Sequence, residues 1–273
     1  MTTPTKPSLS CPLLLTHITT ATVLLKLNNT TTFLTDPVFS PAGTEYDYGS
    51  VNLKVLSSPA LSLSDLPPID CILLSHEDHP DNLDSPGRTL LNGRRVLTTP
   101  AGRKALAPRP GVVALKPWET VSLDLGGGKK FDITGTPARH LPGGEVVGFL
   151  ISSEEVMGTT DGKPNAVWFS GDTVYMPELL EMKEKFHVSV ALVNLADVHV
   201  PAQVGEKAVK ITMVGTDAVK LMKGIGADVL VPIHYEGWSH FRQGREELEK
   251  VFREEGVEDR VRWCEMGVAT KLA

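Results

Sequence analysis

The sequence predicts an α/β sandwich in a single domain, and three features support this prediction. Short apolar runs recur along both halves of the chain, helical stretches are fewer and lie between them, and no long linker or fixed-period repeat divides the chain. A length of 273 residues is enough for one large α/β domain with a sizeable core. We expect residues 1–10, rich in Thr, Pro and Ser, to be a flexible tail and residues 11–273 to form one domain.

In the first half, TVLLKL (22–27) and TTFLT (31–35) predict two strands, and Asn28-Asn29 between them predicts a hairpin turn. Further strands are expected over residues 71–75, 95–99, 112–115, 120–125 and 130–135. A glycine triplet, 126–128, joins the last two of these strands. No helix start follows the triplet, so a hairpin turn is favoured over a phosphate-binding loop.

In the second half, residues 146–152 and 166–170 predict paired strands around a polar loop. Residues 189–195 and 228–233 have the continuous apolar character of strands buried on both faces. Helices are expected at roughly 100–107, 177–186, 215–223 and 242–255. The last helix is densely charged, which indicates a solvated face and not a binding patch.

Composition narrows the class of function. The hydrophobic fraction of 41% and the charged fraction of 22% are typical of a soluble globular protein, and the net charge of −6 argues against a nucleic-acid surface. Three scattered cysteines form neither a disulfide framework nor a Cys-type zinc site. No apolar run approaches the ~18 residues of a membrane span. We therefore expect a cytoplasmic protein with a small-molecule substrate, no nucleic-acid or membrane partner, and scope for a homo-oligomer.

Histidines and carboxylates follow the predicted strands at four separate points. His76 and His79 follow CILLS, His140 follows KFDITGTPAR, Asp172 follows AVWFSG, and His234 follows DVLVPI. Catalytic groups concentrate on loops that rigid strands hold in place. Imidazole and carboxylate together suit zinc, iron or manganese, so the sequence favours a metal site over a solvated turn in LLSHEDHPDNLD.

Five stretches carry a resemblance to a known superfamily. They are LTHITTATVLLKLNNTTTFLTDPVFSP (15–41), LLSHEDHPDNLD (73–84), TPARH (136–140), SGDT (170–173) and VPIHYEGWSHF (231–241). In this order they resemble the metallo-β-lactamase fold superfamily of metal-dependent hydrolases, and most of all its ascorbate-6-phosphate lactonase-like branch. The resemblance covers nearly the whole chain and implies a four-layer αββα sandwich.

The resemblance also implies a set of metal ligands. By position, His140 matches a ligand of a first metal, and His79 matches the second histidine of the motif. Asp172 matches the carboxylate that bridges two metals. His234 and Asp81 match ligands of a second metal, and Asp81 also matches the residue that handles the proton of the nucleophile.

The motif itself departs from the usual order His-x-His-x-Asp-His. Counting back from Asp81 places Glu77 at the first histidine, so His76 fits only with one inserted residue, although the preceding serine favours that alignment. Counting forward places Asn82 at the last histidine, and asparagine is a poor replacement for imidazole. We expect one or two Zn²⁺ ions, with Mn²⁺ or Fe²⁺ as alternatives.

The expected reaction is hydrolysis by a metal-activated water. Asp81 would orient the water and accept its proton, Tyr235 would donate to the oxyanion, and Asp36 and Glu77 would orient the imidazoles. The expected substrate is a small lactone or lactam, with phosphodiester or phosphate-ester hydrolysis as the alternative. A catalytically degenerate ligand-binding protein is a third interpretation, supported by Glu77 and Asn82.

Other side chains are candidates for the substrate pocket. The candidates that contact substrate are His17, Tyr46, His199, Trp238 and His240. Each also has a structural interpretation, because buried aromatics and single histidines often serve packing. Four arginines are expected at the surface, although they could face an anionic substrate: Arg88, Arg94, Arg95 and Arg103.

Overall fold

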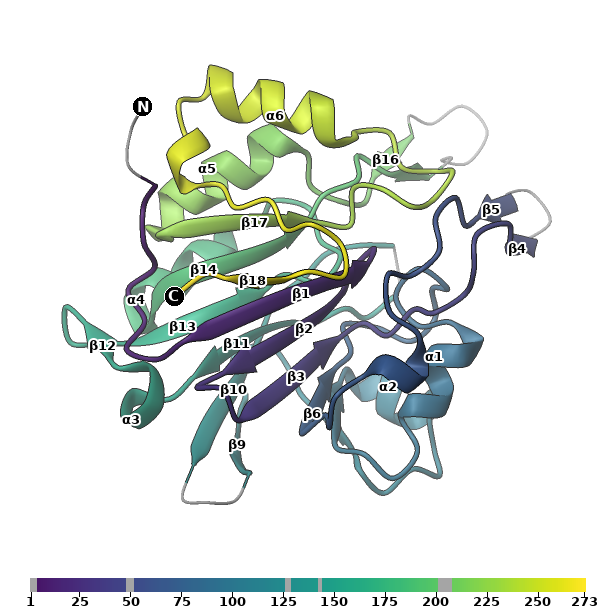
Figure 1. The fold of residues 1–273 in the computed structure, drawn as a ribbon, viewed down its shortest axis with the longest axis horizontal. Helices are drawn as coiled ribbons and strands as arrows, with labels where there is room; N and C mark the ends of the chain where they lie inside the picture. Colours follow the sequence, from purple (N-terminus) through teal and green to yellow (C-terminus); the bar gives the residue numbers. More distant parts are fainter. Residues whose placement is uncertain (1–3, 48–51, 126–128, 142–143, 201–207) are drawn as a thin grey trace.

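Two β-sheets face each other between outer layers of helices (Figure 1). This computed structural model describes residues 4–47, 52–125, 129–141, 144–200 and 208–273. The arrangement is the α/β fold with several sheets and few helices that the sequence predicts, and the helices lie outside both sheets as in the expected four-layer sandwich.

The first sheet combines antiparallel strands from the N-terminus with parallel strands that follow them. Its strand order is β18 (Ala269–Lys271), β1 (Leu13–Thr19), β2 (Thr22–Leu27), β3 (Thr31–Thr35), β6 (Cys71–Leu73), β7 (Val96–Thr98) and β8 (Val112–Ala114). Strands β1 to β3 pair antiparallel, whereas β3, β6, β7 and β8 pair parallel. Asn28 and Asn29 have φ of 50° and 57°, which confirms the predicted hairpin turn.

The second sheet is built from the second half of the chain. Its strand order is β17 (Val229–Ile233), β14 (His187–Asn194), β13 (Lys163–Phe169), β11 (Gly148–Ser152), β10 (Lys130–Thr136) and β9 (Thr120–Asp124), with β12 (Thr159–Thr160) paired to β13. Strands β13, β14 and β17 are parallel, and β10 runs in the same direction because β11 is antiparallel to both β10 and β13. Four strands of this sheet therefore end at one edge.

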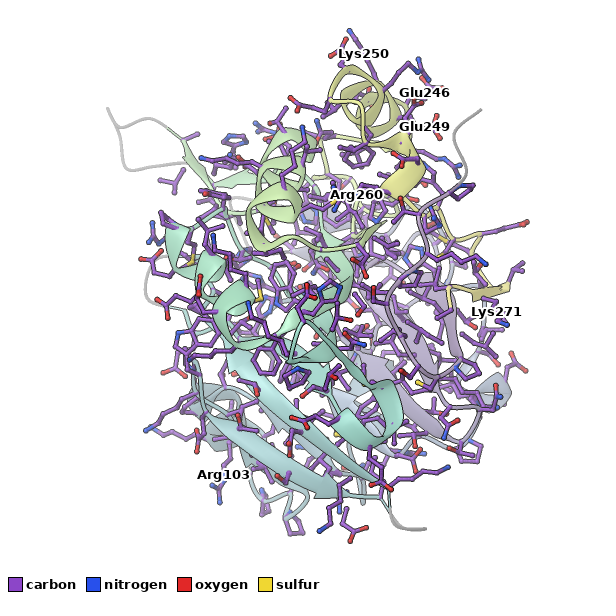
Figure 2. The ribbon with its side chains drawn as sticks, turned by 90° about the vertical axis from the view of Figure 1, so that its left-hand side faces the viewer. Arg103, Glu246, Glu249, Lys250, Arg260 and Lys271 are labelled. Atoms are coloured by element: carbon purple, nitrogen blue, oxygen red, sulfur yellow. The ribbon has the colours of Figure 1, made fainter. Side chains whose placement is uncertain are left out.

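Helices cover the outer faces of the two sheets. The α-helices are α1 (Ser85–Leu90), α2 (Pro100–Ala105), α3 (Glu154–Met157), α4 (Met182–Lys185), α5 (Gly215–Ile225) and α6 (Arg245–Glu254), and 3-10 turns span Leu63–Asp65, Pro177–Glu181 and Glu258–Arg260. In α6, Leu248 and Phe252 face inward, while Glu246, Glu249 and Lys250 project from the rim in Figure 2. The position of these charged side chains at the surface agrees with the solvated face predicted for this helix.

The core has three layers because strand side chains alternate between two faces. In β13, Val167 and Phe169 pack between the sheets, whereas Ala166 and Trp168 pack under α5 and α6. A third cluster lies between the first sheet and α1, with Ile72 and Leu74 among its members. All three cysteines are buried and free. The described residues contain no helix that combines the length and apolar character of a membrane span.

The described residues 4–10 make hydrogen bonds to distant parts of the chain. Thr5 N–H donates to Asp259 O at 3.0 Å, and Ser8 N–H donates to the Asp228 carboxylate at 2.8 Å. Ser10 N–H donates to Met157 O at 3.0 Å. These bonds connect the segment to the 3-10 turn Glu258–Arg260, to the residue before β17 and to α3. The flexible tail stays a prediction, and residues 1–3 lie outside the described residues, as does the predicted glycine turn at 126–128.

We predict that Phe131→Ala destabilises the fold by about 3–5 kcal/mol, since it leaves a cavity between the sheets. Phe131 is fully buried and meets Phe33 edge-on, with ring centroids 5.7 Å apart. Urea unfolding measures the change. Leu56→Ala is the control, because Leu56 is 58% exposed and should change stability by no more than about 0.5 kcal/mol. Equal effects of the two substitutions would contradict the assigned core.

Candidate metal centre

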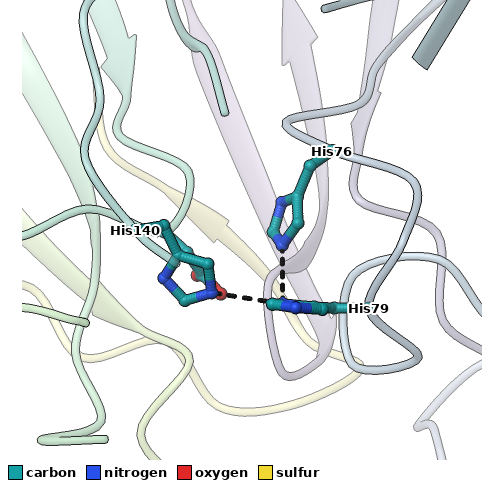
Figure 3. A group of neighbouring side chains, drawn as sticks. His76, His79 and His140 are labelled. Carbon is teal, nitrogen blue, oxygen red and sulfur yellow. Dashed lines mark hydrogen bonds and ion pairs between the residues drawn. The ribbon is translucent and has the colours of Figure 1, made fainter. Parts of the chain in front are cut away.

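Three imidazole nitrogens converge beyond the ends of β6 and β10 (Figure 3). His76 Nε2 lies 3.0 Å from His79 Nδ1, and His79 Nδ1 lies 3.1 Å from His140 Nε2. Nitrogens bound at about 2.0–2.1 Å to one tetrahedral zinc lie roughly 3.4 Å apart. The spacing therefore suits three ligands of one metal.

The outer nitrogens of two rings have hydrogen-bond partners that orient them. His140 Nδ1–H donates to Ile211 O at 2.7 Å, and His76 Nδ1–H donates to Ser75 Oγ at 2.8 Å. Burial lowers the pKa of His76 well below its usual value and also lowers the pKa of His140. Both rings are therefore neutral at pH 7, with an unprotonated Nε2 facing inward, as metal ligation requires.

Asp36 links the motif loop to the first sheet. Its carboxylate accepts hydrogen bonds from Ser75 N–H (2.7 Å), Ser75 Oγ–H (2.6 Å) and Asn82 Nδ2–H (3.0 Å). Burial raises the pKa of Asp36 to about 7, although these hydrogen bonds oppose the rise. Because Ser75 also contacts His76, Asp36 lies where the sequence expects a group that orients the imidazoles.

A second group of donors adjoins the three histidines. His234 Nε2 lies 3.5 Å from Asp81 Oδ2 and 3.5 Å from Asp172 Oδ1, while Asp172 Oδ2 lies 3.9 Å from His140 Nε2. Each oxygen of Asp172 thus faces one of the two groups. Burial alone would raise the pKa of both carboxyls, but the nearby histidines lower the pKa of Asp81 well below its usual value and lower that of Asp172.

The turn that carries Asp172 is tightly packed. Asn194, at the end of β14, donates from Nδ2 to Asp172 Oδ1 at 2.6 Å. Gly171 has a φ of 57°, and a Cβ there would lie 2.7 Å from Ser75 Cβ. Glycine is therefore required for the turn to approach the motif loop this closely.

His234 adopts an uncommon backbone conformation for a residue with a side chain, with a φ of 60°. Its N–H donates to Thr20 O at 2.9 Å, and His17 Nε2–H donates to the same oxygen at 2.9 Å. Trp238 Nε1–H donates to Thr20 Oγ1 at 3.0 Å. His17 and Trp238 thus support the loop behind His234.

The donor set fits bound metal ions. One group contains His76, His79, His140 and Asp172, the other Asp81, Asp172 and His234, and within each group the donor atoms lie within 4.8 Å of one another. Both ring nitrogens of His234 are buried without a hydrogen bond in the described part of the chain, although Nε2 lies at ion-pair distance, 3.5 Å, from Asp81 Oδ2 and Asp172 Oδ1. Buried polar atoms rarely stay unpaired, so a ligand for His234 is implied.

Comparison with known families agrees with this geometry. The sequence matches the family described as the beta-lactamase superfamily domain over residues 31–235, about three quarters of the chain. The chain belongs to this superfamily. The match contains both donor groups and ends before His240. Membership places the chain among metallo-hydrolases.

Solved structures share the fold at low identity. The isothiocyanate hydrolase from Delia radicum gut bacteria is 20% identical, with a TM-score of 0.75 over 95% of this chain and 99% of that one. A possible metal-dependent hydrolase from Veillonella parvula is 18% identical, with a TM-score of 0.73 over 94% and 98%. CmlA, a diiron β-hydroxylase from Streptomyces venezuelae, is 16% identical, with a TM-score of 0.64 over 100% and 55%.

The motif departs from the superfamily order at two positions, which Glu77 and Asn82 occupy, and the structure places these two side chains differently. His76, and not Glu77, joins His79 and His140, so the loop accommodates the one inserted residue. The Glu77 side chain is half-buried outside both donor groups, and Arg88 donates to the backbone carbonyl of this residue. Asn82 points its amide nitrogen at Asp36. Their roles as ligands or orienting groups stay predictions.

A pocket of about 260 Å³ opens onto the two donor groups. Of the five residues predicted to contact substrate, His199 and His240 line it, whereas His17, Tyr46 and Trp238 do not. Tyr46 instead packs 5.7 Å from the Trp238 ring, and its hydroxyl lies 2.8 Å from Ser40 Oγ.

Tyr235 does not reach the pocket. Its ring lies under the outer helices, 5.4 Å from the Trp263 ring, and burial raises its pKa to about 12. The two neighbouring side chains point in opposite directions. His234 points to the metal centre, and Tyr235 points to the cluster under α5 and α6. This position does not support the predicted oxyanion role, and we do not assign it.

Sequence reasoning missed two residues that hold the site together. Asn194 contacts Asp172, and Ser75 joins His76 to Asp36. A polar residue that ends an apolar strand was the available signal for Asn194. For Ser75, the sequence suggested only its alignment with the superfamily motif.

We predict that Asn194→Ala weakens metal affinity by about 10- to 100-fold, because Asp172 loses the group that orients it. Isothermal titration with Zn²⁺ measures the affinity. Asn165→Ala is the control, since Asn165 is equally buried but donates to Met157 O, away from both donor groups. Unchanged affinity in Asn194→Ala would contradict its assigned contribution.

Proposed function

We propose that this chain is a metal-dependent hydrolase that opens a small lactone or lactam ring. The observation that carries the proposal is the pair of His/Asp donor groups at the base of a mostly apolar pocket. A divalent metal bound by such donors lowers the pKa of water to about 7 and polarises the oxygen of an electrophile.

Asp81 is suited to hold the attacking water. Its pKa lies well below the usual value, so the carboxylate is ionised at neutral pH and accepts a hydrogen bond. Its side chain is buried and lines the pocket. Asp81 would therefore orient the water toward the substrate and accept its proton.

The pocket walls favour a compact, uncharged substrate. Apolar walls come from Leu53, Leu141, Val198, Val200 and Ile211. A volume of about 260 Å³ suits a small molecule. His199 borders this space and offers a polar contact that could orient the ring.

A phosphate ester is a weaker candidate. No lysine or arginine is among the lining residues in the described ranges, so apart from the bound metal and the lining histidines no cationic side chain there would pair with phosphate. The lack of lysine and arginine also argues against a phosphorylated lactone, the kind of substrate after which the ascorbate-6-phosphate lactonase-like branch is named. The isothiocyanate hydrolase of similar fold is named for a small electrophilic substrate, which supports the proposed size class.

For the metal we propose Zn²⁺, with Mn²⁺ or Fe²⁺ as alternatives. Three imidazoles in the first group suit zinc, while two carboxylates in the second also suit manganese or iron. A cytoplasmic location and the absence of nucleic-acid or membrane partners remain part of the proposal, as does scope for a homo-oligomer.

We predict that chelation abolishes hydrolysis of a lactone and lactam panel, and that adding Zn²⁺, Mn²⁺ or Fe²⁺ restores it. Loss of the several kcal/mol that a metal supplies lowers kcat/KM by about 100-fold or more. A parallel panel of phosphodiesters tests the alternative. Full activity after complete metal removal would contradict the proposal, and metal-dependent turnover of phosphodiesters alone would replace the proposed substrate class.

A further inference from the structure

We propose that His240 takes the place of the histidine that the motif lacks at position 82, as a ligand of the second metal. This inference rests on the proposed function, because it concerns the metal that Asp81, Asp172 and His234 would hold. It assigns to a histidine outside the matched superfamily range the role that Asn82 leaves open.

The contacts of Asp81 are the first argument. His240 Nε2 lies 3.2 Å from Asp81 Oδ2, and His234 Nε2 lies 3.5 Å from the same oxygen. Two donors bound at about 2.0–2.2 Å to one ion lie roughly 3.0–3.5 Å apart. Both histidines thus stand at ligand spacing from one carboxylate oxygen.

The orientation of Asn82 is the second argument. Its side chain is fully buried, and its Nδ2 donates to Asp36 Oδ2 at 3.0 Å. The amide nitrogen is therefore committed to the network beneath His76, while Oδ1 is buried without a hydrogen-bond partner among the described residues. A neutral amide oxygen is a weaker ligand for a transition metal than an imidazole nitrogen. Without His240 the second group holds a single imidazole, that of His234, beside two carboxylates.

The surroundings of His240 are the third argument. Its ring packs 4.6 Å from the Phe241 ring, which in turn lies 4.5 Å from the His234 ring. His240 Nδ1 is buried without a hydrogen-bond partner among the described residues, so no other bond fixes the imidazole. The side chain is 19% exposed toward the pocket, which leaves it room to approach the second group more closely than its present position outside the 4.8 Å set.

A hydrogen bond from His240 to Asp81 is the competing interpretation of the 3.2 Å contact. His240→Gln separates the two, because glutamine keeps an N–H donor at similar reach but is a poor ligand for a transition metal. If His240 only positions Asp81 through a hydrogen bond, His240→Gln should keep the second metal. If His240 is a metal ligand, the substitution should weaken binding of the second metal.

The experiment titrates the metal-free full chain with Co²⁺ and follows visible absorption, with bound metal counted by elemental analysis. We expect two equivalents in the unsubstituted protein. In His240→Gln we expect an unchanged first equivalent and a second that binds at least about tenfold more weakly with an altered spectrum. His199→Gln, which changes another pocket histidine, should keep both equivalents.

Two results overturn the inference: a second equivalent in His240→Gln with unchanged affinity and spectrum, or a single equivalent in the unsubstituted protein. In either case the proposed function stands if His79→Ala removes the first equivalent. Failure of the unsubstituted protein to bind any Co²⁺ would instead contradict the proposed function. Should His240→Gln not fold, His240→Ala and the imidazole count of the second Co²⁺ by X-ray absorption decide the same question.

Discussion

The structure depends on donor atoms that face one another at the edge of the two sheets. His76, His79 and His140 direct ring nitrogens at one point, and Asp172 adds an oxygen from the same side. Unprotonated nitrogens and ionised carboxylates in this arrangement repel one another and lose their hydration on burial. A bound cation satisfies all of them at once, and the surrounding hydrogen bonds hold the donors in positions that favour its binding.

Much of the fold follows from patterns that the sequence displays. Apolar runs with strand character correspond to strands of both sheets, and the Asn28-Asn29 turn has the positive φ values that a tight hairpin needs. The order of the strands could not be derived this way, because it depends on long-range pairing such as β1 with β18 at the opposite end of the chain. The hydrogen bonds of residues 4–10 could not be derived for the same reason, since their partners lie far away in sequence.

Site residues could be predicted from the sequence where a metal-binding residue type, histidine or aspartate, follows a predicted strand, as with His140 and Asp172. They could not be predicted where spatial packing decides. Tyr235 adjoins a donor in sequence yet faces the opposite side of the sheet. Asn194 gains its contact with Asp172 only because β13 and β14 run parallel and end together. For His240, the contact with Asp81 spans 159 positions of sequence.

The roles of all the other site residues depend on a metal ion bound by the convergent histidines. Crystals grown with Zn²⁺ and measured on both sides of the zinc absorption edge test this binding most directly. We expect an anomalous difference peak about 2.0–2.1 Å from His76 Nε2, His79 Nδ1 and His140 Nε2. A fully zinc-exposed crystal with no peak at that point, or with zinc bound only elsewhere on the molecule, would contradict it.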